Sequence, residues 1–141
     1  MIVLGIAGGS GTGKSTVARH VAERFRGVHV DADRVAHAVL DEDAAVIARL
    51  RESFGDDILN ADGGVNRLRL GRRVFADAGQ LARLNAIVHP AVAARCGGAV
   101  TAARASGARV AVVDAALLLE VPMPFAFDLL LALTADTATR L

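Results

Sequence analysis

The sequence of 141 residues contains no tryptophan, no tyrosine and a single cysteine. One cysteine cannot form an internal disulfide, which excludes the disulfide-stapled class of small secreted domains and fits a reducing compartment. Lysine is scarce as well, because Lys14 is the only lysine among 16 lysine and arginine residues. A strong charge of one sign is also absent, since the net charge at pH 7 is +1. The charge therefore gives no case for nucleic acid or an anionic membrane as the main partner.

Long uninterrupted apolar runs are missing too. The most apolar stretch, residues 108–138, is interrupted by Asp114, Glu120, Asp128 and two prolines, so no segment supplies the roughly 18 to 20 apolar residues of a membrane span. The N-terminus has no basic region and too short an apolar run for a signal peptide. With 53% apolar residues, the chain has the composition of one folded domain rather than of a disordered chain. We expect a cytoplasmic protein that is a monomer or a weak homo-oligomer.

What the sequence does contain is a glycine-rich loop in a strand–loop–helix setting. Residues 2–7 form a short apolar run that predicts a buried parallel strand. From about Ser15 to Phe25, apolar residues recur every four positions, which predicts an amphipathic helix. Residues 27–30 then predict a second short strand. A strand, a helix and a strand within about 30 residues indicate a βαβ unit and a parallel sheet.

The glycine-rich loop between that first strand and helix reads GGSGTGKST, from Gly8 to Thr16. It fits the Walker A pattern, in which glycines let backbone N–H groups surround phosphate oxygens and the following helix adds its positive end. Lys14 would reach the β- and γ-phosphates, and the Ser15 hydroxyl would ligate Mg²⁺. This motif does not choose between an NTPase, a GTPase and a kinase. The predicted nucleotide-binding residues are Gly9, Ser10, Gly11, Thr12, Gly13, Lys14, Ser15 and Thr16.

The middle of the chain has helical rather than strand patterns. We expect a helix through residues 47–54, a turn at 60–64, and helices over 67–75 and 81–88. Pro90 is expected to break or kink the last of these, with a helix resuming to about residue 105. Residues 108–114 and 127–133 read as strands. The predicted fold is therefore α/β: a three-layer P-loop NTPase or kinase core with a parallel sheet (residues 1–33 and 108–141), with a helical insertion over about residues 34–107 between strands 2 and 3. Together these parts form one domain.

Carboxylates follow two of the predicted strands. Phosphoryl transfer to an alcohol needs a group that orients the hydroxyl and accepts its proton, and Asp31 or Asp33 is well placed for it. The alternative for either residue is a cap on a helix that starts near Arg34. Asp114 closes the run VAVVD, as a carboxylate that holds Mg²⁺ through water would, although an aspartate at a strand end is also common in loops.

Other candidates are less specific. The arginines at 67, 69, 72 and 73 form either a basic face for a phosphate-bearing substrate or an ordinary solvated helix face. His89 lies either in a site or at a helix boundary beside Pro90. His20 and His29 read as surface or packing residues. Cys96 has no partner at useful spacing and reads as structural.

Taken together, these segments resemble the dephospho-CoA kinase family. The resemblance lies in residues 5–18, 30–37, 54–77 and 81–92, with weaker matches at 112–120 and 137–141, so it covers nearly the whole chain in order. Many proteins share the phosphate loop. The paired DAD and the long series FG…GVNR…L…VF…L…HP are quite specific to this family.

The resemblance implies ATP-dependent phosphorylation of the ribose 3′-hydroxyl of dephospho-CoA, the last step of coenzyme A synthesis, with ATP, Mg²⁺ and dephospho-CoA as the only implied partners. Asp33 would accept or orient the 3′-hydroxyl. Arg67 and His89 would lie in or near the acceptor site, and Arg140 would approach the ATP phosphates from the lid. Lys14 and Ser15 keep the roles given above.

The sequence departs from the family pattern in three places. Ala116 and Leu119 stand where the family has a proline and an aromatic residue, and Thr137 stands where it has glutamine. Family members also continue for some tens of residues beyond the position of Leu141, through the rest of the lid, a last strand and the adenine-contacting loop, which close over the phosphates. We therefore expect the 141 residues to be a shortened form. Two alternatives stay open: a kinase for a nucleoside monophosphate or another small metabolite, and an ATP-binding fragment without activity.

Overall fold

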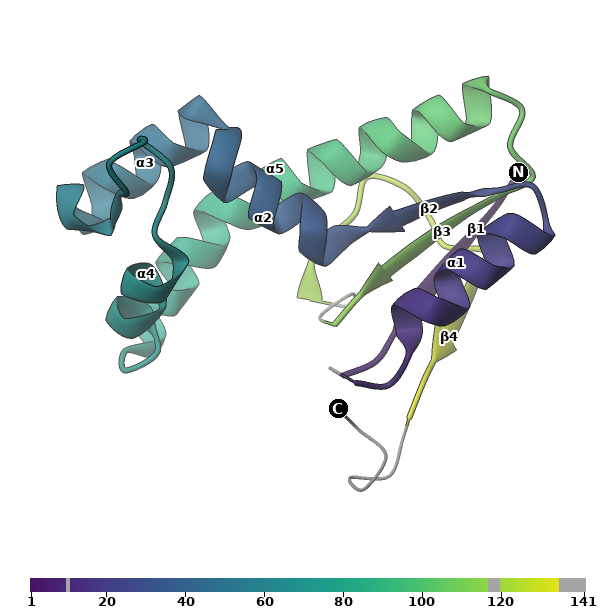
Figure 1. Ribbon diagram of the computed structural model, residues 1–141, viewed down its shortest axis with the longest axis horizontal. Coiled ribbons are helices and arrows are strands. Elements are labelled where there is room, and N and C mark those ends of the chain that lie inside the picture. Colours follow the sequence, from purple (N-terminus) through teal and green to yellow (C-terminus); the bar gives the residue numbers. More distant parts are fainter. Residues whose placement is uncertain (10, 117–119, 135–141) are drawn as a thin grey trace. The chain divides into compact units, whose positions relative to one another are not determined.

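The computed structural model describes residues 1–9, 11–116 and 120–134 (Figure 1). Its elements follow the order strand, helix, strand, a run of helices, and two strands. They are β1 (Ile2–Ala7), α1 (Lys14–Arg24), β2 (Val28–Asp31), α2 (Ala32–Glu42), α3 (Ala44–Phe54), the 3₁₀ helix η1 (Asp56–Ile58), α4 (Arg67–Val74), α5 (Ala78–Ala105), β3 (Val110–Ala115) and β4 (Leu129–Ala132).

The four strands form one parallel sheet in the order β2-β3-β1-β4. In this register Asp114 of β3 lies beside Ile6 of β1 on one side and beside Asp31 of β2 on the other. The carboxyl ends of these strands therefore meet at one edge of the sheet, which is where α/β proteins bind their ligands. The predicted α/β fold with a parallel sheet is confirmed.

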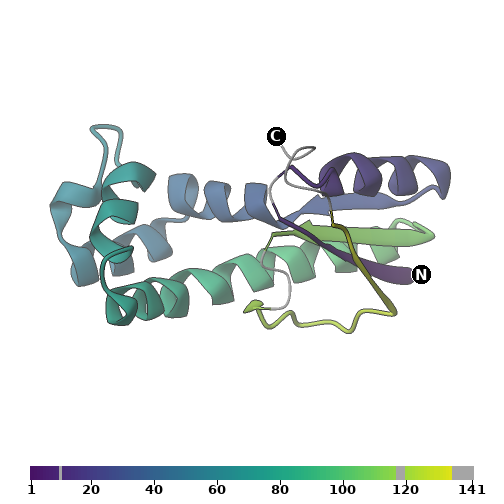
Figure 2. The same cartoon turned by 90° about the horizontal axis from the view of Figure 1, so that it is seen from below.

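Two helices cover the two faces of the sheet, α1 on one and the part of α5 from residue 93 onward on the other (Figures 1 and 2). On the α1 side, Ala18 and Ala22 pack against Ile6, Val110 and Val112. The small alanines let the helix lie close to the branched strand residues. This packing holds the N-terminus of α1 above the carboxyl edge of the sheet.

The start of β2 lies unusually close to β3. A Cβ at Gly27 would stand 2.4 Å from the Val110 carbonyl oxygen and 2.2 Å from its Cγ1. A side chain at position 27 would thus push β2 away from β3. Glycine is required here because it alone permits this approach.

The chain divides into two compact units, residues 1–34 with 93–141, and residues 35–92. The second unit is helical and is held by local contacts. Asp43 and Asn66 cap α3 and α4 by accepting from the backbone N–H groups of Val46 and Arg69. The prediction of one kinase domain with an insertion over about 34–107 stays a prediction.

The helix containing Pro90 differs from expectation. We expected Pro90 to break or kink the helix, and α5 runs continuously over 28 residues with Pro90 inside it. The buried side chains of Ile87, Val88 and Val92 surround this position on both sides in sequence. Burial of these residues offsets the hydrogen bond that proline cannot donate, so a break at Pro90 is wrong, whereas a kink there stays a prediction.

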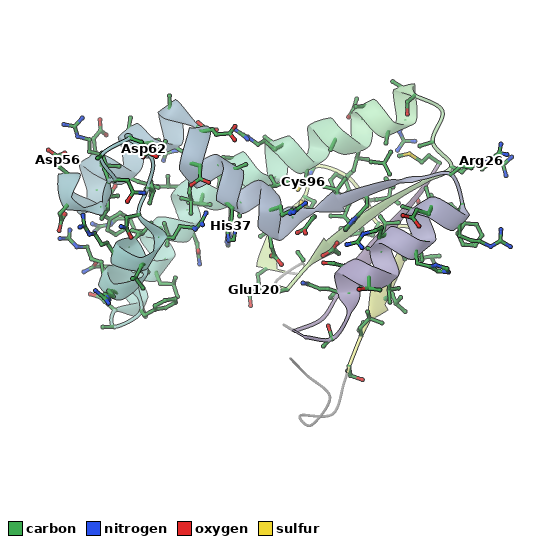
Figure 3. The ribbon with its side chains drawn as sticks, in the orientation of Figure 1. Arg26, His37, Asp56, Asp62, Cys96 and Glu120 are labelled. Carbon is green, nitrogen blue, oxygen red and sulfur yellow. The ribbon has the colours of Figure 1, made fainter. Side chains whose placement is uncertain are left out.

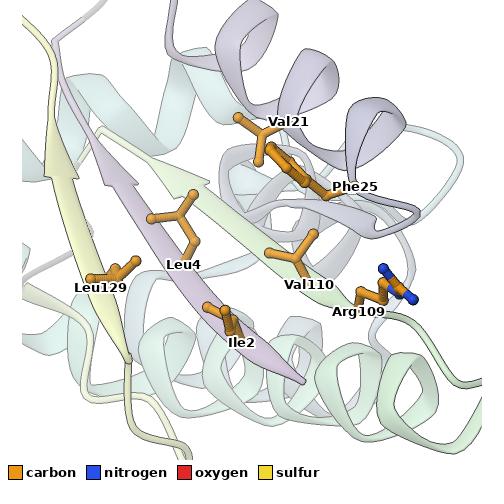
Figure 4. Close-up of a pocket in the computed structure, with 7 residues that line it drawn as sticks. All are labelled: Ile2, Leu4, Val21, Phe25, Arg109, Val110 and Leu129. Carbon is orange, nitrogen blue, oxygen red and sulfur yellow. The ribbon is translucent and has the colours of Figure 1, made fainter.

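β4 forms an exposed edge of the sheet. Leu129, Leu130 and Leu131 are 59%, 57% and 40% exposed. Beside it, an apolar pocket of about 390 Å³ opens between α1 and the amino-terminal ends of β1, β3 and β4 (Figure 4). This pocket lies at the end of the strands opposite the glycine-rich loop. In the described part of the chain, no helix is both long and apolar enough to cross a membrane.

Candidate phosphate-binding and catalytic site

The glycine-rich loop closes on itself between β1 and α1. The Thr12 backbone N–H donates to the Gly9 carbonyl at 3.3 Å, and the Thr12 hydroxyl donates to the same oxygen at 2.7 Å. Gly13, at φ 82°, occupies the left-handed region immediately before α1, a conformation that favours glycine. The loop and the first turn of α1 line a small hollow of about 190 Å³.

The hollow has the chemistry of an anion site. It is lined by Gly9, Gly11 and Gly13 together with Lys14, Ser15 and Thr16, the first three residues of α1. The N–H groups of a first helical turn have no partner within the helix, and they carry the positive end of the helix dipole. Lys14 adds an ammonium whose side chain is only 13% exposed.

Asp114 lies beneath this turn and is fully buried, with 0% exposure. Its Oδ1 accepts a hydrogen bond from the Ser15 hydroxyl at 3.3 Å and lies 3.9 Å from the Lys14 ammonium. Its Oδ2 contacts Nε2 of His29 on β2. Three elements, α1, β2 and β3, thus converge on one carboxylate.

The two aspartates of the DAD segment take different roles in the structure. The Asp31 carboxylate accepts from the Arg34 backbone N–H at 3.1 Å and so caps the first turn of α2. The Asp33 side chain points toward the phosphate loop. Its Oδ2 lies 3.4 Å from Lys14 Nζ, and half of the side chain is exposed. The capping alternative therefore describes Asp31, and Asp33 is the carboxylate beside the phosphate loop.

The donor set of Ser15 and Asp114 fits Mg²⁺ in type. Hydroxyl and carboxylate oxygens are ligands that Mg²⁺ accepts, and this ion is usually held by one or two protein oxygens together with substrate phosphates. Within the described residues, no cluster of three or more His, Cys, Asp or Glu side chains could hold a metal ion unaided. These oxygens therefore suit an ion that arrives with a nucleotide.

The remaining predicted site residues belong to the second unit or lie outside the described residues. Arg67 and His89 belong to the second unit, where Arg67 pairs with Asp41 at 3.6 Å and His89 lies half-buried on α5. Ser10 and Arg140 lie outside the described residues, as do Leu119 and Thr137.

The other arginines of α4 have local partners. Arg73 donates to the Phe54 carbonyl and, at 2.6 Å, to the Asp57 carboxylate, and Arg69 donates to the Asp57 carbonyl at 3.4 Å. Both side chains tie α4 to the segment that follows α3. A substrate-binding role for the whole arginine cluster is therefore not needed to explain Arg69 and Arg73.

His29 is the residue of this cluster that sequence reasoning missed. We expected a surface or packing residue, and the structure places its ring against a buried carboxylate. A usable signal was present: His29 and Asp31 are two apart on one strand and so share a face, and that strand was predicted to lie in the same sheet as Asp114.

Comparison with known proteins identifies the chain's relatives. The family model described as dephospho-CoA kinase matches residues 2–141. A dephospho-CoA kinase of Streptomyces avermitilis is 42% identical over 141 residues, and this chain covers 67% of its length. An uncharacterised protein of Schizosaccharomyces pombe is 36% identical over 125 residues, which are 89% of this chain and 53% of that protein. The chain thus spans between about half and two thirds of these two relatives.

A solved structure gives the same result for the fold. A crystal structure of a Thermus thermophilus protein superimposes with a TM-score of 0.70 at 26% identity, covering 99% of this chain and 68% of that one. The match extends over the whole α/β arrangement described above. On the family model and the identity to its relatives, the chain belongs to the dephospho-CoA kinase family, the ATP-dependent kinases that phosphorylate dephospho-CoA to give coenzyme A.

Proposed function

We propose that this chain transfers the terminal phosphoryl group of ATP to the ribose 3′-hydroxyl of dephospho-CoA, in the cytoplasm and without nucleic-acid partners. The observation that carries the proposal is the 3.4 Å separation of Lys14 Nζ and Asp33 Oδ2. It puts the one lysine of the phosphate loop beside a half-exposed carboxylate at the carboxyl edge of the sheet. Family membership supports dephospho-CoA as the acceptor, and this contact supports the assignment of Lys14 and Asp33 to phosphoryl transfer.

Lys14 and Asp33 have different roles in the proposed reaction: Lys14 binds the phosphates, and Asp33 acts on the hydroxyl. When ATP is bound, its β- and γ-phosphate oxygens compete with Asp33 for the Lys14 ammonium, and the loop N–H groups hold the same oxygens. Asp33 then accepts the proton of the 3′-hydroxyl. The 3′-oxygen forms a bond to the γ-phosphorus, the bond from that phosphorus to the bridging oxygen breaks, and ADP leaves. Positioning and electrostatics supply most of the acceleration.

Ser15 and Asp114 are the residues that would hold Mg²⁺. Such an ion neutralises charge on the phosphate oxygens and so favours the transfer. The chain's own contribution is the Ser15–Asp114 hydrogen bond at 3.3 Å, which sets the hydroxyl and the carboxylate side by side before the ligand arrives. Because Asp114 is fully buried, bulk solvent does not compete with Ser15 for this hydrogen bond.

Three further roles follow from the family pattern. Arg67 and His89 are proposed to contact dephospho-CoA in the second unit, and Arg140 is proposed to approach the ATP phosphates. Arg67 is 48% exposed in its ion pair with Asp41, so an anionic acceptor can displace that carboxylate at low cost. Guanidinium groups suit phosphate because they donate two parallel hydrogen bonds.

The deciding experiment is an acceptor panel. The purified chain is incubated with Mg²⁺ and ATP and with dephospho-CoA or AMP, and the products are identified by mass spectrometry and ³¹P NMR. We expect a 3′-phosphorylated product from dephospho-CoA alone, with ADP formed in equal amount. The Lys14→Ala variant serves as the control for contaminating kinases.

Other outcomes separate the alternatives. Phosphorylation of AMP with dephospho-CoA inert would refute the acceptor assignment and favour a nucleoside monophosphate kinase. ATP binding by calorimetry with no product from either acceptor would identify an ATP-binding fragment. This last alternative has a specific observation behind it, because the chain covers only part of the length of its relatives.

A further inference from the structure

The contact between His29 and Asp114 has no place in the reaction described so far. His29 lies on β2, and its Nε2 contacts the Oδ2 of Asp114 at the carboxyl end of β3. The His29 side chain is 21% exposed, whereas that of Asp114 is completely buried. A polar side chain that reaches a fully buried carboxylate beside the phosphate loop calls for an explanation.

The sheet register makes the contact possible. Asp31 lies directly beside Asp114, and His29 precedes Asp31 by two residues, so its side chain points to the same face of the sheet. That face is the one covered by α1. Val110 and Val112 lie four and two residues before Asp114 on β3, so they share its face, and they pack against α1. The imidazole thus extends diagonally along this face from one strand to the next.

The contacts of Asp114 are divided between its two oxygens. Oδ2 faces His29, and Oδ1 faces Ser15 and Lys14 at 3.3 and 3.9 Å. A carboxylate has only acceptor oxygens, so the imidazole Nε2 must donate. With Oδ2 occupied by this donor, rotation of the carboxylate about its Cβ–Cγ bond would break a hydrogen bond that bulk solvent does not replace at a fully buried group.

We propose that His29 is a positioning residue, which fixes the Asp114 carboxylate so that its other oxygen faces Ser15 and Lys14. Outer partners of metal-holding carboxylates orient those ligands, and their loss typically weakens metal affinity or activity by about 10- to 100-fold. The inference rests on the proposed role of Ser15 and Asp114 toward Mg²⁺. His29 itself touches neither nucleotide nor acceptor in this scheme.

The test compares three variants in nucleotide binding. His29→Leu removes the donor at similar volume, His29→Gln keeps an N–H donor, and His20→Leu makes the same exchange at an exposed position of α1. Calorimetry measures the affinity for a non-hydrolysable ATP analogue with Mg²⁺ and with EDTA. We expect His29→Leu to lose about 10- to 100-fold of the Mg²⁺-dependent affinity and little of the affinity in EDTA. His29→Gln should recover most of the loss, and His20→Leu should match the wild type.

A purely structural role predicts a different pattern. If His29 only supports β2, His29→Leu lowers the thermal midpoint and weakens binding equally with Mg²⁺ and with EDTA, and His29→Gln gives no recovery. Equal weakening with Mg²⁺ and with EDTA would overturn the proposal, and so would a lack of recovery in His29→Gln. Unchanged binding in His29→Leu would overturn it as well.

A second measurement needs no nucleotide. A long-range ¹H–¹⁵N NMR spectrum of the wild type should show His29 protonated at Nε2, and the ring signals should shift in Asp114→Ala. A ring protonated only at Nδ1 would refute the contact. If the wild type failed to bind the analogue at all, the proposed function would fall, and this spectrum would still decide whether His29 holds Asp114.

Discussion

The exchange Asp33→Asn separates a catalytic role of this carboxylate from a structural one, because the two roles predict very different magnitudes. The structural cost is small. Asp33 is half exposed, and its one described ion pair is with Lys14 at 3.4 Å. The Asp33 end of this pair faces solvent, and ion pairs screened by solvent contribute about 0 to 1 kcal/mol to stability. We therefore expect the free energy of unfolding of Asp33→Asn to fall by less than about 1 kcal/mol.

The catalytic cost should be much larger. Asparagine keeps the size of the side chain and loses the charge and the capacity to take the proton of the 3′-hydroxyl. Loss of such a group typically costs at least about a hundredfold in turnover, which corresponds to about 2.7 kcal/mol of transition-state stabilisation. The ratio of the two effects, rather than either one alone, identifies the role.

Asp31→Asn is the matched control, since it makes the same exchange two residues earlier. Asp31 caps α2 through the Arg34 N–H, and asparagine caps a helix about as well as aspartate. Turnover is followed by coupled ADP release, and stability by urea unfolding of the same preparations. Near-normal turnover in Asp33→Asn, or an equal loss in Asp31→Asn, would refute the assignment of Asp33.

Three further predictions concern other parts of the chain. Lys14→Arg should fold normally yet lose at least about a hundredfold in turnover, because the planar guanidinium can bridge Asp33 and Asp114 and remain there; wild-type kinetics would contradict this reasoning. Cys96, labelled on helix α5 in Figure 3, is buried, and burial raises the pKa of its thiol from 9.0 to about 11. The native protein should therefore resist iodoacetamide at pH 8 by mass spectrometry, and rapid native labelling would be incompatible with a buried thiol. The folded state then binds the proton of the Cys96 thiol more tightly than the unfolded state does. The contribution of this thiol to stability is therefore present below pH 9 and is lost toward pH 11. Pro90→Ala should stabilise the chain by roughly 1 to 3 kcal/mol in urea unfolding, because alanine restores a donor inside α5; unchanged or lower stability would contradict this reasoning.

The strands and the phosphate loop could be predicted because their signals are local. Residues 2–7 were predicted as a strand, and β1 has these bounds. Gly13 and Lys14 follow from a motif whose spacing is dictated by backbone geometry. Helix α3 likewise ends at Phe54, before Gly55 with φ 92°, as the glycine after an apolar helix indicates.

Long-range contacts could not be predicted in the same way. No local pattern says that Asp33 rather than Asp31 faces Lys14, because capping and catalysis use the same side chain in the same short segment. The choice depends on where α2 begins, at Ala32 rather than near Arg34. Pro90 shows the same limit, since packing around α5 outweighs the local preference to end the helix.

The charges of the site explain why one lysine is kept among so many arginines. One ammonium, that of Lys14, lies within 4 Å of two carboxylates, Asp33 at 3.4 Å and Asp114 at 3.9 Å. If both carboxylates are ionised, this group of three carries a net charge of −1, so a bare polyphosphate meets repulsion as well as the loop N–H groups. A compact point charge on a flexible stem can leave the carboxylates for the phosphates as they arrive. The two carboxylates would then take their proposed roles, Asp33 toward a hydroxyl and Asp114 toward a divalent cation. In the proposed scheme, this arrangement favours a nucleotide that arrives with a cation, and it pairs the proposed hydroxyl-activating group with Lys14 until the nucleotide binds.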